Sequence, residues 1–93
     1  MPAIKDITVT KPTEEQIAAC RQWPIWTCGP SKFDWEYTQT ETCLIIEGKV
    51  TVSAQGESSE SVTFGAGDLV VFPTGLKCIW NIEQTVKKHY NFT

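Results

Sequence analysis

From residue 23 onward, the sequence is a succession of short segments rich in Val, Ile, Thr, Trp and Tyr, each bounded by Gly, Pro, Ser or Asn. Such segments are typical of β strands joined by turns. Many short strands at this spacing predict an all-β sandwich or barrel. Glu47 and Gly48 separate two of the segments, and we expect a tight hairpin there.

The N-terminal part carries the one helical signal of the sequence. Residues 4–9 alternate apolar and polar side chains, which predicts a half-buried strand. Thr13 and Gln16 have the spacing of a capping box, and good helix formers follow them. We therefore expect one short helix that ends before Pro24.

Length and charge limit the classes of function. The 93 residues, of which 41 % are hydrophobic, are enough for one core. We therefore predict a single domain over residues 1–93, with a strand and helix at 1–22 and a barrel at 23–93. Eight basic and eleven acidic residues give a net charge of −3 with no basic stripe. We expect no nucleic-acid partner, because phosphate binding needs clustered Lys and Arg.

Neither a membrane segment nor a signal peptide is expected. The apolar runs are far shorter than the roughly 20 residues that cross a bilayer, and the first ten residues lack the pattern of a signal peptide. We therefore expect a cytoplasmic protein with no membrane partner. Cys20, Cys28, Cys43 and Cys78 form no C-x-x-C pair, which favours free thiols, although a disulfide framework with three possible pairings stays open.

Five residues between positions 29 and 48 have the spacing of a known motif. Gly29, Trp35, Tyr37, Glu41 and Gly48 are separated by five, one, three and six residues. The segment resembles the first motif of the cupin family. In that motif, histidines stand at the positions of Trp35 and Tyr37, and a glutamate stands at the position of Glu41.

A second segment resembles the second cupin motif in the same way. Gly67, Pro73, Gly75, Cys78 and Ile82 fit its spacing, with histidine expected at Cys78 and asparagine at Ile82. The resemblance implies an RmlC-like jelly-roll β-barrel with one short N-terminal α-helix. The stretches KPTEEQ, WPIW and KHYNF are similar to those of small single-domain cupins grouped with ureidoglycine aminohydrolase.

The resemblance also implies where a metal would bind. In the family, the two histidines and the glutamate of the first motif and the histidine of the second bind one metal ion, and here only Glu41 keeps its residue type. The indole of Trp35 offers no lone pair, Tyr37 would bind only as phenolate, and the Cys78 thiolate prefers softer ions. We therefore predict no cofactor. The alternative is a divalent metal held by Glu41, Tyr37 and Cys78, with or without His89.

Our leading hypothesis is that the barrel binds a small polar metabolite without a metal, in a pocket lined by Trp35, Tyr37, Glu41, Cys43, Cys78 and Trp80. The alternative is an enzyme that acts on a small nitrogenous or sugar-derived metabolite, similar to ureidoglycine aminohydrolase. Glu41 would then be the general acid or base and Tyr37 a hydrogen-bond donor. Glu41 can also be a structural remnant. If it is desolvated, it needs a proton or a partner, because an unpaired buried charge is costly.

Other polar residues receive structural interpretations beside the chemical ones. Cys43 or Cys78 could be a nucleophile activated by His89, but buried cysteines more often only fill space. We expect His89 to point outward on the last strand. We expect solvated charges at Lys77, Lys87 and Lys88.

A purely structural or partner-binding role stays open, in which Trp35 and Tyr37 fill the pocket. A cavity large enough for a ligand would favour binding, and a packed one would favour the structural role. We expect a homodimer, because small cupins commonly pair through their sheets and the N-terminal strand could extend a neighbour's sheet edge.

Overall fold

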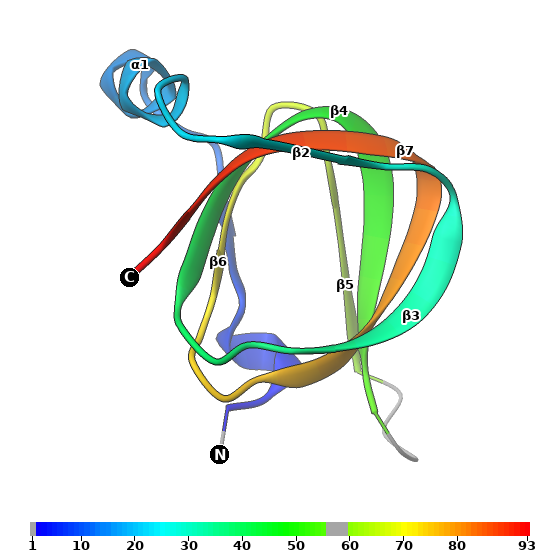
Figure 1. Ribbon diagram of the computed structural model, residues 1–93. Coiled ribbons are helices and arrows are strands. Elements are labelled where there is room, and N and C mark those ends of the chain that lie inside the picture. Colours follow the sequence, from blue (N-terminus) through cyan, green and yellow to red (C-terminus); the bar gives the residue numbers. More distant parts are fainter. Residues whose placement is uncertain (1, 56–59) are drawn as a thin grey trace.

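The computed structural model describes residues 2–55 and 60–93, and its strands wrap around a common core (Figure 1). In chain order, the elements are η1 Ile4–Asp6, β1 Thr8–Thr10, α1 Glu14–Cys20, β2 Ile25–Cys28, β3 Ser31–Glu36, β4 Glu41–Ala54, β5 Ser61–Gly65, β6 Leu69–Phe72 and β7 Lys77–Phe92. The prediction of a mostly β chain with one short α-helix is confirmed. Within the described residues, no helix is long and apolar enough to cross a membrane.

The helix α1 begins and ends where the sequence predicts. The backbone N–H of Thr13 donates to Gln16 Oε1 at 2.8 Å, and the backbone N–H of Gln16 donates to Thr13 Oγ1 at 3.2 Å. These two bonds form the expected capping box and satisfy two backbone donors at the helix start. The helix ends at Cys20, before Pro24.

The segment before the helix differs from its prediction. In place of a strand over residues 4–9, the chain forms the 3-10 turn η1 and then the short strand β1. The backbone N–H of Ala3 donates to Asp6 Oδ2 at 2.8 Å, which closes the turn. Ile4 and Ile7 are both buried. Ile4 and Ile7, which suggested the alternation of a strand, are therefore buried together for another reason. They are three residues apart on a tight turn, and side chains at this spacing point the same way.

The described strands form one antiparallel sheet in the order β1-β6-β4-β7-β2, with β5 paired to β4 and β3 paired to β7. The two long strands β4 and β7 run side by side and belong to both halves of the curved sheet (Figure 1). β6 and β2 pair with their ends near residues 41–44 and 86–89, while β5 and β3 pair with their other ends. This arrangement is consistent with a jelly roll. The strand order has two ends within the described residues, so the predicted closed barrel is not confirmed.

The predicted hairpin at Glu47 and Gly48 is wrong, because β4 continues through both residues. The register between β4 and β7 shifts on either side of Glu47 and again after Lys49, which marks a β-bulge. Gly48 has φ +102°, and a Cβ at this position would lie 2.4 Å from the carbonyl oxygen of Thr85. Gly48 thus bends a long strand around the core and does not form the predicted turn between two short strands.

Two groups of apolar side chains hold the sheet together. The larger core fills the space that the sheet surrounds, and the rings of Tyr37 and Phe72 stack there at 4.7 Å between centroids. The smaller group packs β4 and β6 against the helix α1, and its buried members are Cys20, Leu44 and Leu69. β4 is therefore covered on both faces at its N-terminal end, which explains its continuous apolar sequence.

Candidate functional site

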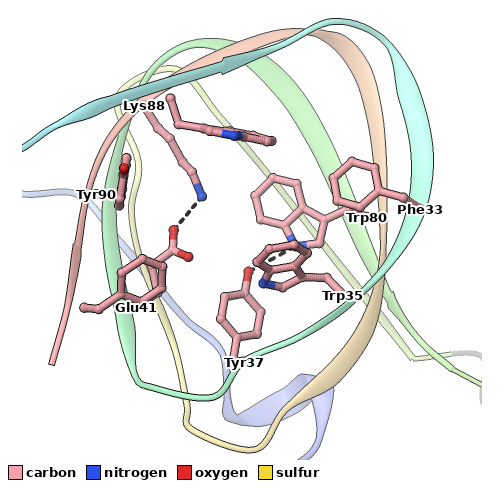
Figure 2. Close-up of a pocket in the computed structure, with 9 residues that line it drawn as sticks. Phe33, Trp35, Tyr37, Glu41, Trp80, Lys88 and Tyr90 are labelled. Carbon is pink, nitrogen blue, oxygen red and sulfur yellow. Dashed lines mark hydrogen bonds and ion pairs between the residues drawn. The ribbon is translucent and has the colours of Figure 1, made fainter.

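A pocket of about 200 Å³ opens at one end of the curved sheet (Figure 2). β2, β3 and β7 supply most of its wall, and Glu41 stands at the first position of β4. The residues that line it are Trp26, Phe33, Trp35, Tyr37, Glu41, Trp80, Lys88, Tyr90 and Phe92. The pocket is mainly aromatic, with one acidic and one basic side chain.

Strand register explains why these side chains meet. Residues that face each other across paired strands lie on the same side of the sheet. Trp26 faces Lys88, and Glu41 faces Phe92. On β3, Phe33 faces Trp80. Alternation along β7 then places its even-numbered residues Trp80, Lys88, Tyr90 and Phe92 on the pocket side.

The acidic and basic side chains form a buried ion pair. Lys88 Nζ lies 2.5 Å from Glu41 Oε2, and the two side chains are only 7 % and 4 % exposed. The ammonium also lies 4.7 Å from the ring centre of Trp80 and 5.0 Å from that of Trp26. The prediction of Lys88 as a solvated charge is therefore wrong. The ion pair and two aromatic faces together replace the water that the ammonium loses.

Tyr37 and Trp80 form a second polar contact at the pocket. The indole Nε1–H of Trp80 donates to the hydroxyl of Tyr37 at 3.0 Å. Burial above all, and then the negative charge of Glu41, raise the pKa of Tyr37 well above its ordinary value. The phenol therefore stays protonated, and its own O–H can donate to a molecule in the pocket.

The two cysteines that the sequence assigned to the pocket do not line it. Cys43 and Cys78 are fully buried in the core. Burial raises the pKa of Cys78 to about 11 and that of Cys43 to about 12, although the Lys88 charge acts in the opposite direction on Cys43. All four cysteines are free thiols. At neutral pH, Cys43 and Cys78 are protonated side chains of the core.

His89 points to the outer side of the sheet, as predicted, but it is buried there instead of exposed. Its side chain is packed at the other side of β7, and Nδ1 donates to the carbonyl oxygen of Trp23 at 2.9 Å. His89 and Cys78 are eleven residues apart on β7, roughly 36 Å along an extended strand. The imidazole is therefore positioned to hold the segment after α1, and the geometry does not favour it as a base for Cys78.

The structure brings Trp35, Tyr37, Glu41 and Trp80 to one pocket. Sequence reasoning missed the remaining lining residues, which are Trp26, Phe33, Lys88, Tyr90 and Phe92. The signal that could have found three of them is the parity of β7. Counting in twos from Trp80 reaches positions 88, 90 and 92, provided that the last two apolar segments are taken as one strand.

Comparison with protein families agrees with this geometry. The model of the EutQ-like cupin domain matches residues 16–90 of the chain. The chain belongs to the EutQ-like cupin family. Solved structures are also similar to the chain, and one of them covers 95 % of it. No curated protein matches it.

Three solved structures share the fold of this EutQ-like cupin. A DUF861 family protein from Thermotoga maritima is 42 % identical, with a TM-score of 0.87 over 95 % of this chain and all of that one. The EutQ protein of Clostridium difficile is 20 % identical, with a TM-score of 0.64 over 73 % of this chain and 52 % of its own. A putative ethanolamine utilization protein from Salmonella typhimurium is also 20 % identical, with a TM-score of 0.63 over 92 % and 68 % of the two chains. At 20 % identity, the similarity shows the fold alone.

The metal-binding positions of the cupin motifs do not suit a metal ion in this EutQ-like cupin. Among residues 2–55 and 60–93, no group of three or more His, Cys, Asp or Glu could hold one. Trp35 has no lone pair to offer, and the thiol of Cys78 is fully buried in the core and does not line the pocket. The carboxylate of Glu41 already binds the ammonium of Lys88. The donor set therefore does not fit a divalent cation.

Proposed function

We propose that this EutQ-like cupin binds a small polar metabolite in the aromatic pocket, without a metal of its own. The observation that carries the proposal is the buried ion pair of Glu41 and Lys88, which faces a cavity of about 200 Å³. Taking two charges out of water costs several kcal/mol per ion, and packed apolar side chains are often at least as stabilising. A role in stability therefore gives no reason for this pair, whereas recognition of a polar ligand does.

The size and rim of the pocket support the same proposal. A volume of about 200 Å³ is below the roughly 300–1,000 Å³ of pockets for drug-sized molecules, so the ligand is small. Trp35 and Phe92 line the pocket and yet are 46 % and 43 % exposed. Large apolar side chains left open to solvent at the mouth of a pocket are suited to cover the apolar face of a bound molecule.

A second candidate is catalysis on a small nitrogenous or sugar-derived metabolite, in line with the resemblance to ureidoglycine aminohydrolase domains. The observation that favours it is the protonated phenol of Tyr37 beside a carboxylate, a donor next to a group that can take up a proton. In this version, Glu41 is the general acid or base, and Lys88 holds it in place. Turnover that Glu41→Gln abolishes, in a variant that stays folded, would support catalysis.

A thermal-shift screen against a library of small metabolites tests the proposal of ligand binding. A ligand at a hundred times its dissociation constant adds about 2.7 kcal/mol to the free energy of unfolding. We expect hits with the natural sequence and with Glu36→Gln, which changes an exposed carboxylate on β3. The same hits should bind more weakly to the Glu41→Gln variant. If Glu41→Gln folds poorly, Trp35→Ala replaces it, and the hits should bind more weakly to that variant as well. No hit with the natural sequence, or hits that both pocket variants leave unchanged, would rule the proposal out.

A further inference from the structure

Three polar groups meet at the base of the aromatic pocket, and each has hydrogen-bonding capacity to spare. The ammonium of Lys88 has three N–H donors, and Glu41 takes one of them. Tyr37 accepts from Trp80 and keeps its own hydroxyl proton. Figure 2 shows the second carboxylate oxygen of Glu41 directed toward the middle of the pocket, away from Lys88. A ligand therefore meets donors and an acceptor side by side.

The charges of the site cancel, which limits the charge of the ligand. An anion near Lys88 would be attracted by the ammonium and repelled by the carboxylate 2.5 Å away, and a cation would meet the reverse. A group without net charge avoids both penalties. It can still bond to both partners if it offers a donor and an acceptor together. A hydroxyl does so, since it donates once and accepts twice.

The aromatic wall indicates the shape of the ligand. Trp26 and Trp80 meet edge to face at 6.0 Å between ring centroids, and Phe33 and Trp35 do so at 6.4 Å. Phe33 and Trp80 lie nearly parallel, at 12° and 6.2 Å between centroids, which leaves no room for a third ring between them. The rings therefore form a continuous wall and not a slot that a flat ring could enter. Such a wall suits the C–H face of a saturated ring, whose weakly positive hydrogens meet the negative face of an aromatic ring.

We infer that the pocket takes an uncharged, polyhydroxylated ring of monosaccharide size. Its hydroxyls bind Glu41, Lys88 and Tyr37, and its C–H face lies against the indoles. The inference rests on the proposed function and adds the chemical class of the ligand. The volume of about 200 Å³ has room for one such ring and little more.

Titration with matched sugars tests this inference, with the fluorescence of the pocket tryptophans as the readout. The neutral probes are D-glucose, D-xylose and D-ribose, and the charged ones are D-glucuronate and D-glucosamine at pH 7. We expect at least one neutral sugar to saturate the signal, and glucuronate and glucosamine to bind about tenfold more weakly or worse. Glu36→Gln should leave these affinities unchanged.

The variant Glu41→Gln gives the sharpest outcome, because it leaves Lys88 as an unbalanced positive charge. Glucuronate should then bind at least as well as glucose, a reversal of the order in the natural protein. Trp35→Ala should weaken the binding of all neutral sugars by about tenfold. This variant provides a second test if Glu41→Gln does not fold.

Three outcomes would overturn the inference. If a charged sugar binds the natural protein as tightly as every neutral one, the pair does not select by charge. If none of the sugars binds while the metabolite screen gives other hits that depend on Glu41 or Trp35, the ligand belongs to another class and the proposed function stands. If neither experiment gives binding, both the inference and the proposed function fail.

Discussion

Lys88 on β7 reaches Glu41 on β4 although the two residues are out of register, since Glu41 faces Phe92 and Lys88 faces Ile45 across the same strand pair. The lysine side chain therefore runs along the inside of the sheet before its ammonium meets the carboxylate at 2.5 Å. Trp26 and Trp80 flank it on the way. The contact ties the start of β4 to the far end of the chain and sets the polar character of the pocket.

Removing the cation should destabilise the fold strongly. Lys88→Met leaves the carboxylate of Glu41 buried without a partner, and breaking a buried pair typically costs about 3–5 kcal/mol. We expect a loss of about 3 kcal/mol in the free energy of unfolding, measured in urea at pH 7. The double variant Glu41→Gln with Lys88→Met should recover much of it, because no unpaired charge remains.

Lys87→Met is the matched control, since Lys87 is the neighbour on the same strand and is only partly buried. Its effect should stay within about 0.5 kcal/mol. If the Lys88→Met protein is as stable as the Lys87→Met protein, Lys88 is not the main partner of Glu41.

Stability should fall as the pH rises above 9. The pKa of Cys78 is raised to about 11 and that of Cys43 to about 12, from a value of 9.0 in the unfolded chain. Between these values, each thiol is ionised only after unfolding, so each lowers the free energy of unfolding by about 1.4 kcal/mol per pH unit. Tyr37, whose pKa is also raised, adds to the effect above pH 10.

Urea titrations at pH 7.5, 9 and 10 measure this loss. Replacing one buried thiol in Cys78→Ala should make the decline with pH shallower, even though the variant starts from a lower stability. Equal stability at pH 7.5 and pH 10 would mean that the thiols ionise in the folded protein. They would then have access to water that the structure does not give them.

Gly48→Ala should be among the most harmful substitutions of a small residue. The new Cβ would lie 2.4 Å from the carbonyl oxygen of Thr85, at a backbone φ of +102° that side chains rarely adopt. We expect a loss of about 2 kcal/mol or more by thermal or urea unfolding. Gly29→Ala is the matched control, because nothing lies within 4 Å of its Cβ position. Equal effects of the two variants would contradict the bulge.

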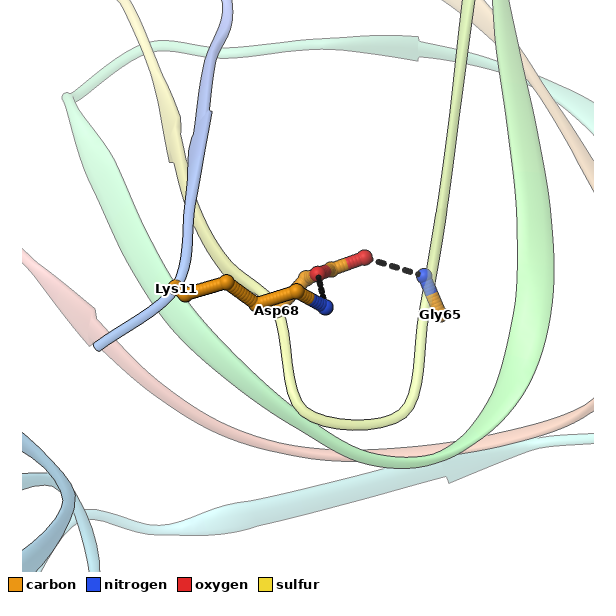
Figure 3. A network of polar contacts seen from close by, with 3 residues as sticks. All are labelled: Lys11, Gly65 and Asp68. Carbon is orange, nitrogen blue, oxygen red and sulfur yellow. Dashed lines mark hydrogen bonds and ion pairs between the residues drawn. The ribbon is translucent and has the colours of Figure 1, made fainter.

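One carboxylate oxygen of Asp68 binds the turn between β5 and β6, and the other binds Lys11 in the segment between β1 and α1 (Figure 3). Oδ2 accepts from the backbone N–H of Gly65 at 2.9 Å, and Oδ1 accepts from Lys11 Nζ at 2.6 Å. Partial burial acts to raise the pKa of Asp68, but the hydrogen bonds from Lys11 and Gly65 outweigh it and hold the pKa below its ordinary value.

A carboxylate of this kind stabilises the fold above the pKa that it has in the unfolded chain. The contribution is lost as the pH falls through the lower pKa of the folded state. We expect Asp68→Ala to cost about 1–2 kcal/mol at pH 7 and nearly nothing at pH 2, measured by urea unfolding. Lys11→Ala should cost less than about 1 kcal/mol, because the Lys11 side chain is 79 % exposed. A cost for Asp68→Ala that does not change with pH would refute the role of the charge.

The sequence by itself determined the kind of fold and part of the site. Segments rich in Val and Ile predicted the strands, the capping box at Thr13 predicted the helix, and the two spaced motifs predicted the cupin fold. These signals can be read from the sequence because each depends on residues close together along the chain. The first motif also identified Trp35, Tyr37 and Glu41 as residues of one pocket wall. The resemblance to the cupin family supplied this grouping, because alternation relates side chains within one strand only, and these three lie on β3, in the segment after it and on β4.

The tertiary structure decided what surrounds those residues. Gly48 could end a strand or bend one, and only the close approach of Thr85 selects the bend. Lys88 looks like any surface lysine until β7 passes beside β4 and brings its ammonium to a carboxylate 47 residues away. Cys78 stands at a motif position, yet packing buries its thiol fully in the core, away from the lining of the pocket. Charge pairing and burial arise between distant segments, so their outcome is set by the folded chain and not by the order of its residues.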